Sequence, residues 1–176
     1  MAIETEVKYL INKLPDNLPN PLYIEQRYFV PTNTLTTILE LFNLSSLENI
    51  STKRVRLIKY NNSISYVITL KTKGLYSREE YEQEITENLY NKILNEPITS
   101  CVIKNRYKIN YQNYTFEFDE YLNLKSPLYT CEVEDEYFEK HQQEIENILK
   151  KYFKVNYQDV TLDAKYKNSN LIKYFG

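Results

Sequence analysis

Charged side chains occupy alternate positions in the first ten residues of the chain. If this segment is an extended strand, side chains alternate between two faces, and Glu4, Glu6 and Lys8 share one of them. Val7 and Tyr9 then lie on the opposite face. Two carboxylates and an ammonium group in one row are costly to bury unless a multivalent ligand lies between them. A metal ion that bridges to a chain of phosphates is one such ligand.

The same alternation recurs in most of the later strand-like segments. The charged residues that share one face of a segment are Arg54 and Arg56; Lys71 and Lys73; Arg78, Glu80, Glu82 and Glu84; Lys104, Arg106 and Lys108; Glu117 and Asp119; and Glu132 and Glu134. A sheet with one face toward water would explain any single strand. Like charges beside each other on nearly every strand repel, however, so the joint pattern favours charged faces that line a hydrated tunnel.

Acidic pairs and basic pairs in such a tunnel would bind different partners. Carboxylate oxygens are the ligands that hard divalent cations prefer. Guanidinium and ammonium groups bind the oxygens of a polyanion through charge-assisted hydrogen bonds. The alternation therefore predicts a site for a divalent cation together with a polyanion. The opposite, more apolar faces of the strands would point outward and be covered by helices.

The elements that must position these residues are mostly strands. Strand-like alternation marks residues 1–12, 22–30, 53–60, 65–71, 78–86, 99–111, 114–122 and 128–136. Helical spacing of apolar residues marks 34–44, 88–95 and 137–153; residues 74–77 are expected to form a loop, and 160–174 a short extended piece that turns helical. The helix at 34–44 would either cap one mouth of the tunnel or decorate the outer surface.

Few of these strands are separated by a long helix, so a parallel sheet is not expected. An antiparallel sheet that closes into a barrel is the natural solution, because closure removes the sheet edges. The sequence therefore predicts an α+β fold, mainly antiparallel β: an eight-stranded closed β-barrel with flanking helices. At 176 residues the chain is expected to form a single domain, 1–176.

Composition excludes several classes of function. With 22 basic and 24 acidic residues and a net charge of −2, the chain is not a nucleic-acid binder driven by bulk charge. A zinc site is not expected at Cys101 and Cys131, and the single histidine, His141, excludes a histidine-dependent catalytic triad. Only two glycines are present, so no glycine-rich loop cradles phosphates.

The sequence also predicts where the protein resides. It contains no run of about 18 apolar residues, so no membrane-spanning helix is expected. The acidic strand begins at once, without the features of a signal peptide, and the two cysteines are expected to be free thiols. We therefore expect a cytoplasmic protein.

The motif Glu4-Thr5-Glu6-Val7-Lys8 resembles the ExExK signature of the CYTH superfamily, also called the triphosphate tunnel metalloenzymes. The resemblance continues in chain order through residues 24–28 (IEQRY), 54–56 (RVR), 68–71 (ITLK), 78–85 (REEYEQEI), 104–107 (KNRY), 116–119 (FEFD), 132–134 (EVE) and 160–166 (VTLDAKY). One such motif is a weak signal, but the ordered set spans nearly the whole chain.

The resemblance implies an eight-stranded antiparallel tunnel that cleaves or rearranges triphosphates with Mg²⁺ or Mn²⁺. It implies that the metal ligands, or the residues directly behind them, are Glu4, Glu6, Asp119, Glu132 and Glu134, with Glu82 or Glu84 joining them. It implies that the phosphates are clamped by Arg54, Arg56, Lys71, Lys104, Arg106 and Lys165. Lys8 would lie near the scissile group, where it either helps to activate water or contacts phosphate.

The function that follows from this resemblance is divalent-metal-dependent hydrolysis of inorganic tripolyphosphate or a small organic triphosphate. The alternatives are a class IV adenylyl cyclase acting on ATP, a thiamine triphosphatase and an RNA 5′-triphosphatase, for which the same residues would serve. A polyphosphate-binding module is the non-enzymatic alternative, but it would not need the acidic pairs. The expected partner is a small-molecule triphosphate rather than nucleic acid, apart from an RNA 5′ end, and the protein is expected to be a monomer or homodimer.

Overall fold

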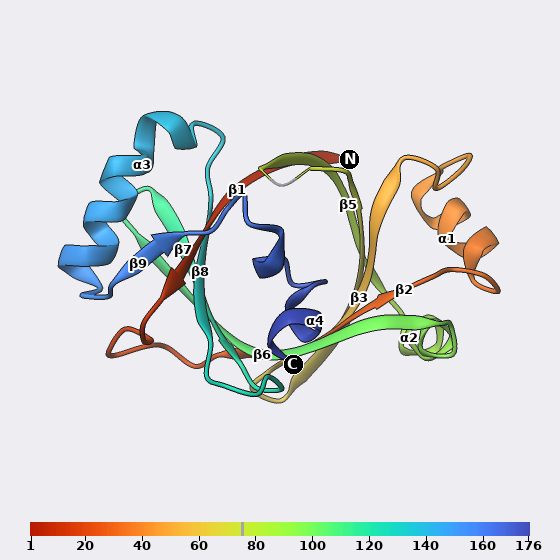
Figure 1. Cartoon of the computed structure of the whole chain (residues 1–176). Coiled ribbons are helices and arrows are strands. Elements are labelled where there is room, and N and C mark those ends of the chain that lie inside the picture. Colours follow the sequence, from red (N-terminus) through yellow and green to blue (C-terminus); the bar gives the residue numbers. More distant parts are fainter. Residues whose placement is uncertain (75) are drawn as a thin grey trace.

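Eight antiparallel strands close into a barrel around the charged side chains (Figure 1). The computed structural model describes residues 1–74 and 76–176. The barrel strands are β1 (Ala2–Ile11), β2 (Leu22–Phe29), β3 (Ile50–Tyr60), β4 (Ser63–Thr72), β5 (Ser77–Ile85), β6 (Ile98–Tyr111), β7 (Tyr114–Tyr121) and β8 (Tyr129–Glu134). Their order is β5-β4-β3-β2-β6-β7-β8-β1, and the pairing of β1 with β5 closes the ring. The predicted closed antiparallel barrel is confirmed.

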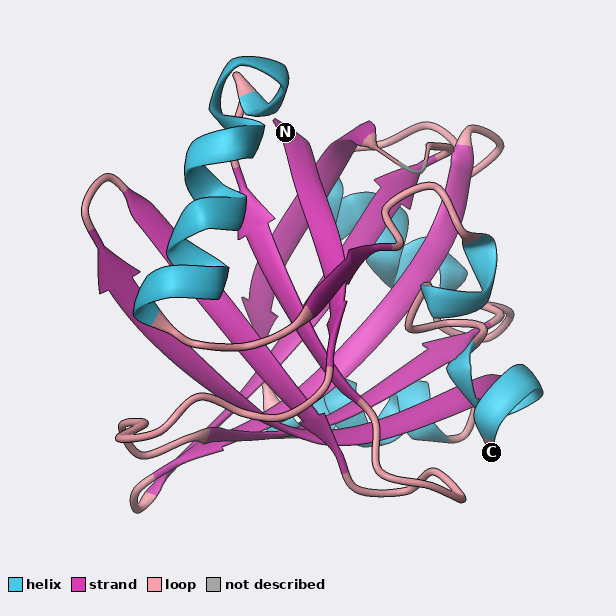
Figure 2. Cartoon of the chain, turned by 60° about the vertical axis from the view of Figure 1, so that its left-hand side comes forward, coloured by secondary structure: helices cyan, strands magenta, loops and turns pink. Residues whose placement is uncertain are grey.

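The other elements are helices, turns and a short extra strand (Figure 2). They are α1 (Leu35–Phe42), α2 (Glu87–Leu94), α3 (Phe138–Asn147), a π-helical turn (Ile148–Tyr152), β9 (Tyr157–Asp159), a 3-10 turn (Ala164–Tyr166) and α4 (Leu171–Phe175). Strand β9 pairs with the end of β1. It was not predicted, because three residues are too few to show an alternating pattern. Within the predicted loop at 74–77, Leu75 lies outside the described residues.

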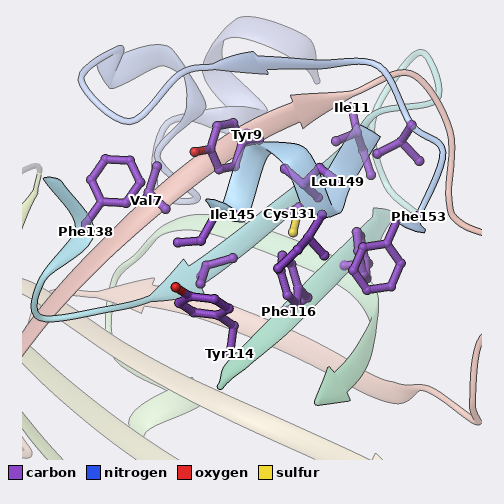
Figure 3. Close-up of a cluster of buried hydrophobic side chains, with 14 residues drawn as sticks. Val7, Tyr9, Ile11, Tyr114, Phe116, Cys131, Phe138, Ile145, Leu149 and Phe153 are labelled. Atoms are coloured by element: carbon purple, nitrogen blue, oxygen red, sulfur yellow. The ribbon is translucent and has the colours of Figure 1, made fainter. Parts of the chain in front are cut away.

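Two apolar clusters lie on the outer face of the barrel, as the alternation predicts. In the first, the outward side chains of β1, β7 and β8 pack under α3 and the π-helical turn, and the cluster includes Phe116, Leu149 and Phe153 (Figure 3). In the second, the outward side chains of β3 and β4, such as Val55 and Ile68, pack against α1 and α2. Burying apolar side chains outside the barrel leaves its inner face to charged residues.

Helix α1 packs on the outside of the barrel, where Ile38 is fully buried in the second cluster (Figure 1). Of the two predictions for this segment, decoration of the outer surface is therefore correct. The chain that lies across the tunnel is instead the C-terminal one: the 3-10 turn and α4 lie within the outline of the barrel in Figure 1. Within the described residues, none of the helices is long and apolar enough to cross a membrane.

Candidate active site

A charged cavity of about 280 Å³ occupies the inside of the barrel. Strand alternation directs every second side chain into it, so its lining repeats the pattern read from the sequence. Among the predicted site residues, the cations that line the cavity are Lys8, Arg54, Arg56, Lys71, Lys104 and Arg106. The carboxylates that line it are Glu4, Glu6, Glu82, Glu132 and Glu134. Segments far apart in the chain thus bring these side chains to one place.

Asp119 organises the cations of β6. Its carboxylate is completely buried and accepts two hydrogen bonds from Arg106, Nε to Oδ1 and Nη2 to Oδ2, each 2.7 Å long. Lys104 Nζ donates to the same Oδ2 at 2.8 Å. Burial alone would raise the pKa of Asp119, but Arg106 and Lys104 lower it below its usual value. Asp119 lies behind the lining rather than in it, so its carboxylate holds the two cations in place.

Glu132 links this group to Lys8. It accepts from Arg106 Nη2 at 3.1 Å, and its other oxygen lies 3.4 Å from Lys8 Nζ. Burial would raise the pKa of Glu132, yet Arg106 and Lys8 hold it well below the ordinary value. Lys8 Nζ also donates to the carbonyl oxygen of Tyr166 at 2.6 Å. Lys8 is therefore a fixed ammonium group between β8 and the C-terminal segment.

The opposite wall presents Arg54 and Arg56 from β3. Arg56 Nη2 donates to Glu82 at 3.1 Å, and Arg54 Nη2 donates to the Thr69 hydroxyl at 3.2 Å. The Nε atoms of both arginines are buried without a hydrogen-bond partner among the described residues. Burial and the neighbouring Arg54 lower the pKa of Arg56 to about 10. A polyanion in the cavity would supply acceptors to these donors, because buried N–H groups of arginine are costly to leave unpaired.

The side chain of Lys71 in β4 reaches Glu4, near the start of β1. Its Nζ donates to both carboxylate oxygens of Glu4, at 2.8 and 2.6 Å, and lies 3.3 Å from Glu80. Arg78 Nε reaches the same Glu4 carboxylate at 3.4 Å. Burial would raise the pKa of Glu4, but Lys71 and Arg78 lower it. Glu4 is thus shared by two cations that line the cavity.

Two further carboxylates face each other without a cation of their own. Glu6 and Glu134 are opposite partners in the β1–β8 ladder, and neither has an ion-pair partner among the described residues. Burial and the charges of Glu132 and Glu4 raise the pKa of Glu6 to about 8. Burial and the charges of Glu4 and Glu117 raise the pKa of Glu134. A divalent cation would relieve this repulsion, because paired carboxylate oxygens are the donors it prefers.

The carboxylates of the cavity do not form a complete set of metal ligands among the described residues. In residues 1–74 and 76–176, no three Asp, Glu, His or Cys side chains are close enough together to hold a metal ion. Glu4 and Glu132 are instead turned toward Lys71, Arg106 and Lys8. The oxygen donors present fit Mg²⁺ or Mn²⁺ in type.

Besides Asp119, two more predicted site residues, Glu84 and Lys165, lie outside the cavity lining. Glu84 follows Glu82 on the same face of β5, but its side chain is exposed near the strand end, where its ladder partner is Val67. The Lys165 side chain is about half exposed, at 51%, and its Nζ lies 3.8 Å from Asp163. It belongs to the 3-10 turn, where the alternation of a strand no longer applies. Glu84 and Lys165, which the resemblance implied as site residues, therefore do not join the other predicted residues in the cavity.

Other lining residues were not among the predicted site residues. The charged ones are Arg78, Glu80, Lys108, Glu117, Asp163 and Lys167. The first four continue the alternation of β5, β6 and β7, so the sequence contained the signal for them. Lys167 lies in the C-terminal segment, outside any strand, and no periodic pattern marks it.

A curated relative decides the family. An inorganic triphosphatase of Acetivibrio thermocellus is 35% identical over 124 residues, which cover 69% of this chain and 72% of that protein. The chain belongs to the CYTH superfamily. A search of family models found no match. The CYTH resemblance inferred from the ordered motifs is confirmed.

Solved structures support the same fold. The crystal structure of the inorganic triphosphatase NE1496 has a TM-score of 0.60 at 25% identity and covers 100% of this chain and 99% of that one. A putative adenylyl cyclase from Hippeastrum, described as having a dominant triphosphatase activity, has a TM-score of 0.58 at 15% identity over 88% of this chain and 90% of its own. The second likeness shows the CYTH barrel alone.

Proposed function

We propose that this protein is a metal-dependent triphosphatase that hydrolyses inorganic tripolyphosphate or a small organic triphosphate inside its tunnel. Membership of the CYTH superfamily and the likeness to two inorganic triphosphatases support the reaction. The observation that carries the proposal is the lining itself. The same cavity is lined by Arg54 and Arg56, whose Nε donors have no partner among the described residues, and by Glu6 and Glu134, which have no ion-pair partner there. A triphosphate together with a divalent cation satisfies both sets.

The phosphate oxygens would be bound by cations from both walls. Arg54 and Arg56 offer their unpaired Nε atoms, and Lys71 lies further along the same wall. Lys104 and Arg106 face them from β6 with their positions fixed by Asp119. Multiple guanidinium contacts neutralise the charge of the triphosphate and hold it in line for attack on phosphorus. We propose that Lys8 donates to the phosphoryl group that is transferred.

Glu6 and Glu134 would hold the metal, with Glu4 and Glu132 completing its coordination. A bound Mg²⁺ or Mn²⁺ would polarise the phosphoryl oxygens and neutralise charge that develops on them. Hydrolysis of tripolyphosphate then forms one P–O bond to water and breaks one bridging P–O bond, which yields phosphate and pyrophosphate. The chain contributes positioning and fixed charge, which are the main demands of phosphoryl transfer. We expect the enzyme to act in the cytoplasm on a small molecule, as a monomer or homodimer.

The first test is phosphate release from tripolyphosphate, ATP and thiamine triphosphate in parallel, with Mg²⁺, with Mn²⁺ and with EDTA. We expect metal-dependent release, fastest from tripolyphosphate, and none in EDTA. The Glu6→Gln variant should lose turnover while keeping the far-UV circular dichroism of the wild type. Formation of cyclic AMP and pyrophosphate from ATP, with tripolyphosphate left intact, would move the assignment to the cyclase. Tight binding of tripolyphosphate without turnover in either metal would leave a binding module.

A further inference from the structure

The C-terminal segment places a cation inside the tunnel. Lys167 follows the 3-10 turn and lines the same cavity as the strand residues. Its Nζ donates to the backbone carbonyl oxygen of Gly74, in the connection between β4 and β5, at 3.1 Å. Two positions earlier, the Lys165 side chain is 51% exposed and does not line the cavity; its Nζ lies 3.8 Å from Asp163 and over the Tyr166 ring. Of these two lysines, only Lys167 is therefore directed into the charged site.

Lys167 lies in a group of like charges. Burial, Arg78 and Lys71 together lower its pKa, so these three cations are close enough to repel one another. Glu4 neutralises Lys71 and Arg78, at 2.6 and 3.4 Å. Within the part of the chain that the structure describes, Lys167 has no carboxylate partner. The carbonyl of Gly74 is a neutral acceptor, so the charge of Lys167 itself is not paired there, whereas Lys71 is paired with Glu4 and Glu80.

We propose that Lys167, with Lys71 and Arg78, forms a subsite for a terminal phosphate of the substrate. This inference rests on the proposed triphosphatase function and adds a residue of the C-terminal segment to the tunnel strands. A terminal phosphate carries up to two negative charges and three free oxygens, which suits three convergent cations. The Lys167 ammonium group would then donate to a phosphate oxygen in place of the Gly74 carbonyl. Lys71 and Arg78 would likewise bind phosphate in place of Glu4, which would leave the Glu4 carboxylate free for the metal.

Contact between Lys167 and a phosphate oxygen would also help to hold the C-terminal segment in its place at the cavity. Lys8 already holds the carbonyl oxygen of Tyr166 at 2.6 Å, and Tyr121 donates to Asn168 at 2.7 Å. Lys167 lies between these two anchored residues, so a phosphate contact at its Nζ needs little further ordering of the chain. A long side chain from this segment thus completes a site that the barrel strands leave open.

Calorimetric titration of tripolyphosphate in EDTA measures this contact without turnover. We expect Lys167→Met to weaken binding about tenfold, because one charge-assisted hydrogen bond to phosphate is lost. With metal present, KM for tripolyphosphate should rise by a similar factor while kcat changes much less. Lys167→Arg should retain most of the affinity. The matched control is Lys173→Met, which removes an exposed lysine of α4 and should bind as the wild type does.

Lys167→Gln separates phosphate binding from simple closure of the segment. Glutamine can still donate a hydrogen bond to the Gly74 carbonyl but carries no charge. Affinity close to that of Lys167→Met supports the subsite, whereas affinity close to wild type shows a structural contact and overturns it. Unchanged affinity in Lys167→Met overturns it as well. If wild-type protein neither binds nor cleaves tripolyphosphate, the proposed function fails instead.

Discussion

The two walls of the tunnel carry similar cations but hold them differently. On the wall formed by β6–β8, Arg106 and Lys104 are fixed by Asp119, whose carboxylate is fully buried. On the wall formed by β3–β5, Arg54 and Arg56 share Glu82, whose side chain is 40% exposed, and both arginines keep an unpaired Nε. One wall is a preformed network, and the other has buried donors without a partner among the described residues.

This difference assigns the two walls different roles. A buried ion pair contributes little net stability over an apolar replacement, but breaking it by removing one partner is costly. A partly exposed pair is screened by water and contributes less. Removing Asp119, which holds the cations of the β6–β8 wall, should therefore act mainly on folding stability, whereas removing an arginine of the β3–β5 wall should act mainly on binding.

The largest effect is expected for Asp119→Asn. The substitution keeps the shape of the side chain but leaves Arg106 and Lys104 buried with less counter-charge. We expect the free energy of unfolding to fall by about 3–5 kcal/mol, measured by urea denaturation at pH 7. A loss below about 1 kcal/mol would show that Glu117 and Glu132 can replace Asp119, and the two walls would then be alike.

The pH dependence of that loss provides a second measurement. The folded-state pKa of Asp119 is lowered, so its stabilising contribution is present above its unfolded pKa of about 3.9 and is lost as pH falls through the folded value. The stability difference between wild type and Asp119→Asn should therefore shrink as the pH falls below about 4. A difference that stays constant down to pH 2 would mean that the charge of Asp119 is not its cause.

The next largest effect is expected on ligand binding, for Arg56→Ala. The guanidinium makes one hydrogen bond to a partly exposed carboxylate, so its removal should change the free energy of unfolding by no more than about 1 kcal/mol. Tripolyphosphate binding in EDTA should weaken about tenfold or more, because a charged donor to phosphate is lost. Unchanged affinity would indicate that Arg56 does not contact the ligand. Lys59→Ala, near the outer end of the same strand, is the matched control.

Glu6→Gln should change stability in the opposite direction from Asp119→Asn. The pKa of Glu6 is raised to about 8, so the folded state keeps this carboxyl protonated while the unfolded state ionises it, and the resulting loss of stability grows as the pH rises from about 4 toward 8. We expect the variant to be more stable than wild type at pH 7, by about 1 kcal/mol, with no gain at pH 4. A less stable variant at pH 7 would show that Glu6 is a structural carboxylate rather than a metal ligand.

Most of the fold could be predicted from the sequence because it depends on alternation. Period-two charge places Glu4 and Glu6 of β1, and Arg54 and Arg56 of β3, on the inner face without knowledge of which strands are neighbours. Apolar residues on the opposite face predict the outer cover of helices. The confirmed barrel follows from these two patterns, together with the need to remove sheet edges.

The parts that the sequence left unspecified depend on contacts rather than on period. Asp119 has the same alternation as Glu117, and only the register of β6 against β7 shows that it lies behind Arg106. Glu84 keeps the alternation of β5, but it lies near the end of the strand, outside the cavity lining. The choice between Lys165 and Lys167 depends on the path of an irregular segment, which no periodic pattern specifies.

The smallest effect, and the sharpest test of the β3–β5 wall, is expected for Glu82→Gln. Glu82 accepts from Arg56 at 3.1 Å and from the Thr69 hydroxyl at 2.9 Å, and it competes with any anion for the two arginines. Because the pair is partly exposed, stability should change by less than about 1 kcal/mol. Tripolyphosphate binding in EDTA should tighten several-fold, because Arg54 and Arg56 no longer have to break an ion pair with the Glu82 carboxylate before they bind phosphate. Weaker binding would mean that Glu82 orients Arg56 as Asp119 orients Arg106, and both walls would then be preformed.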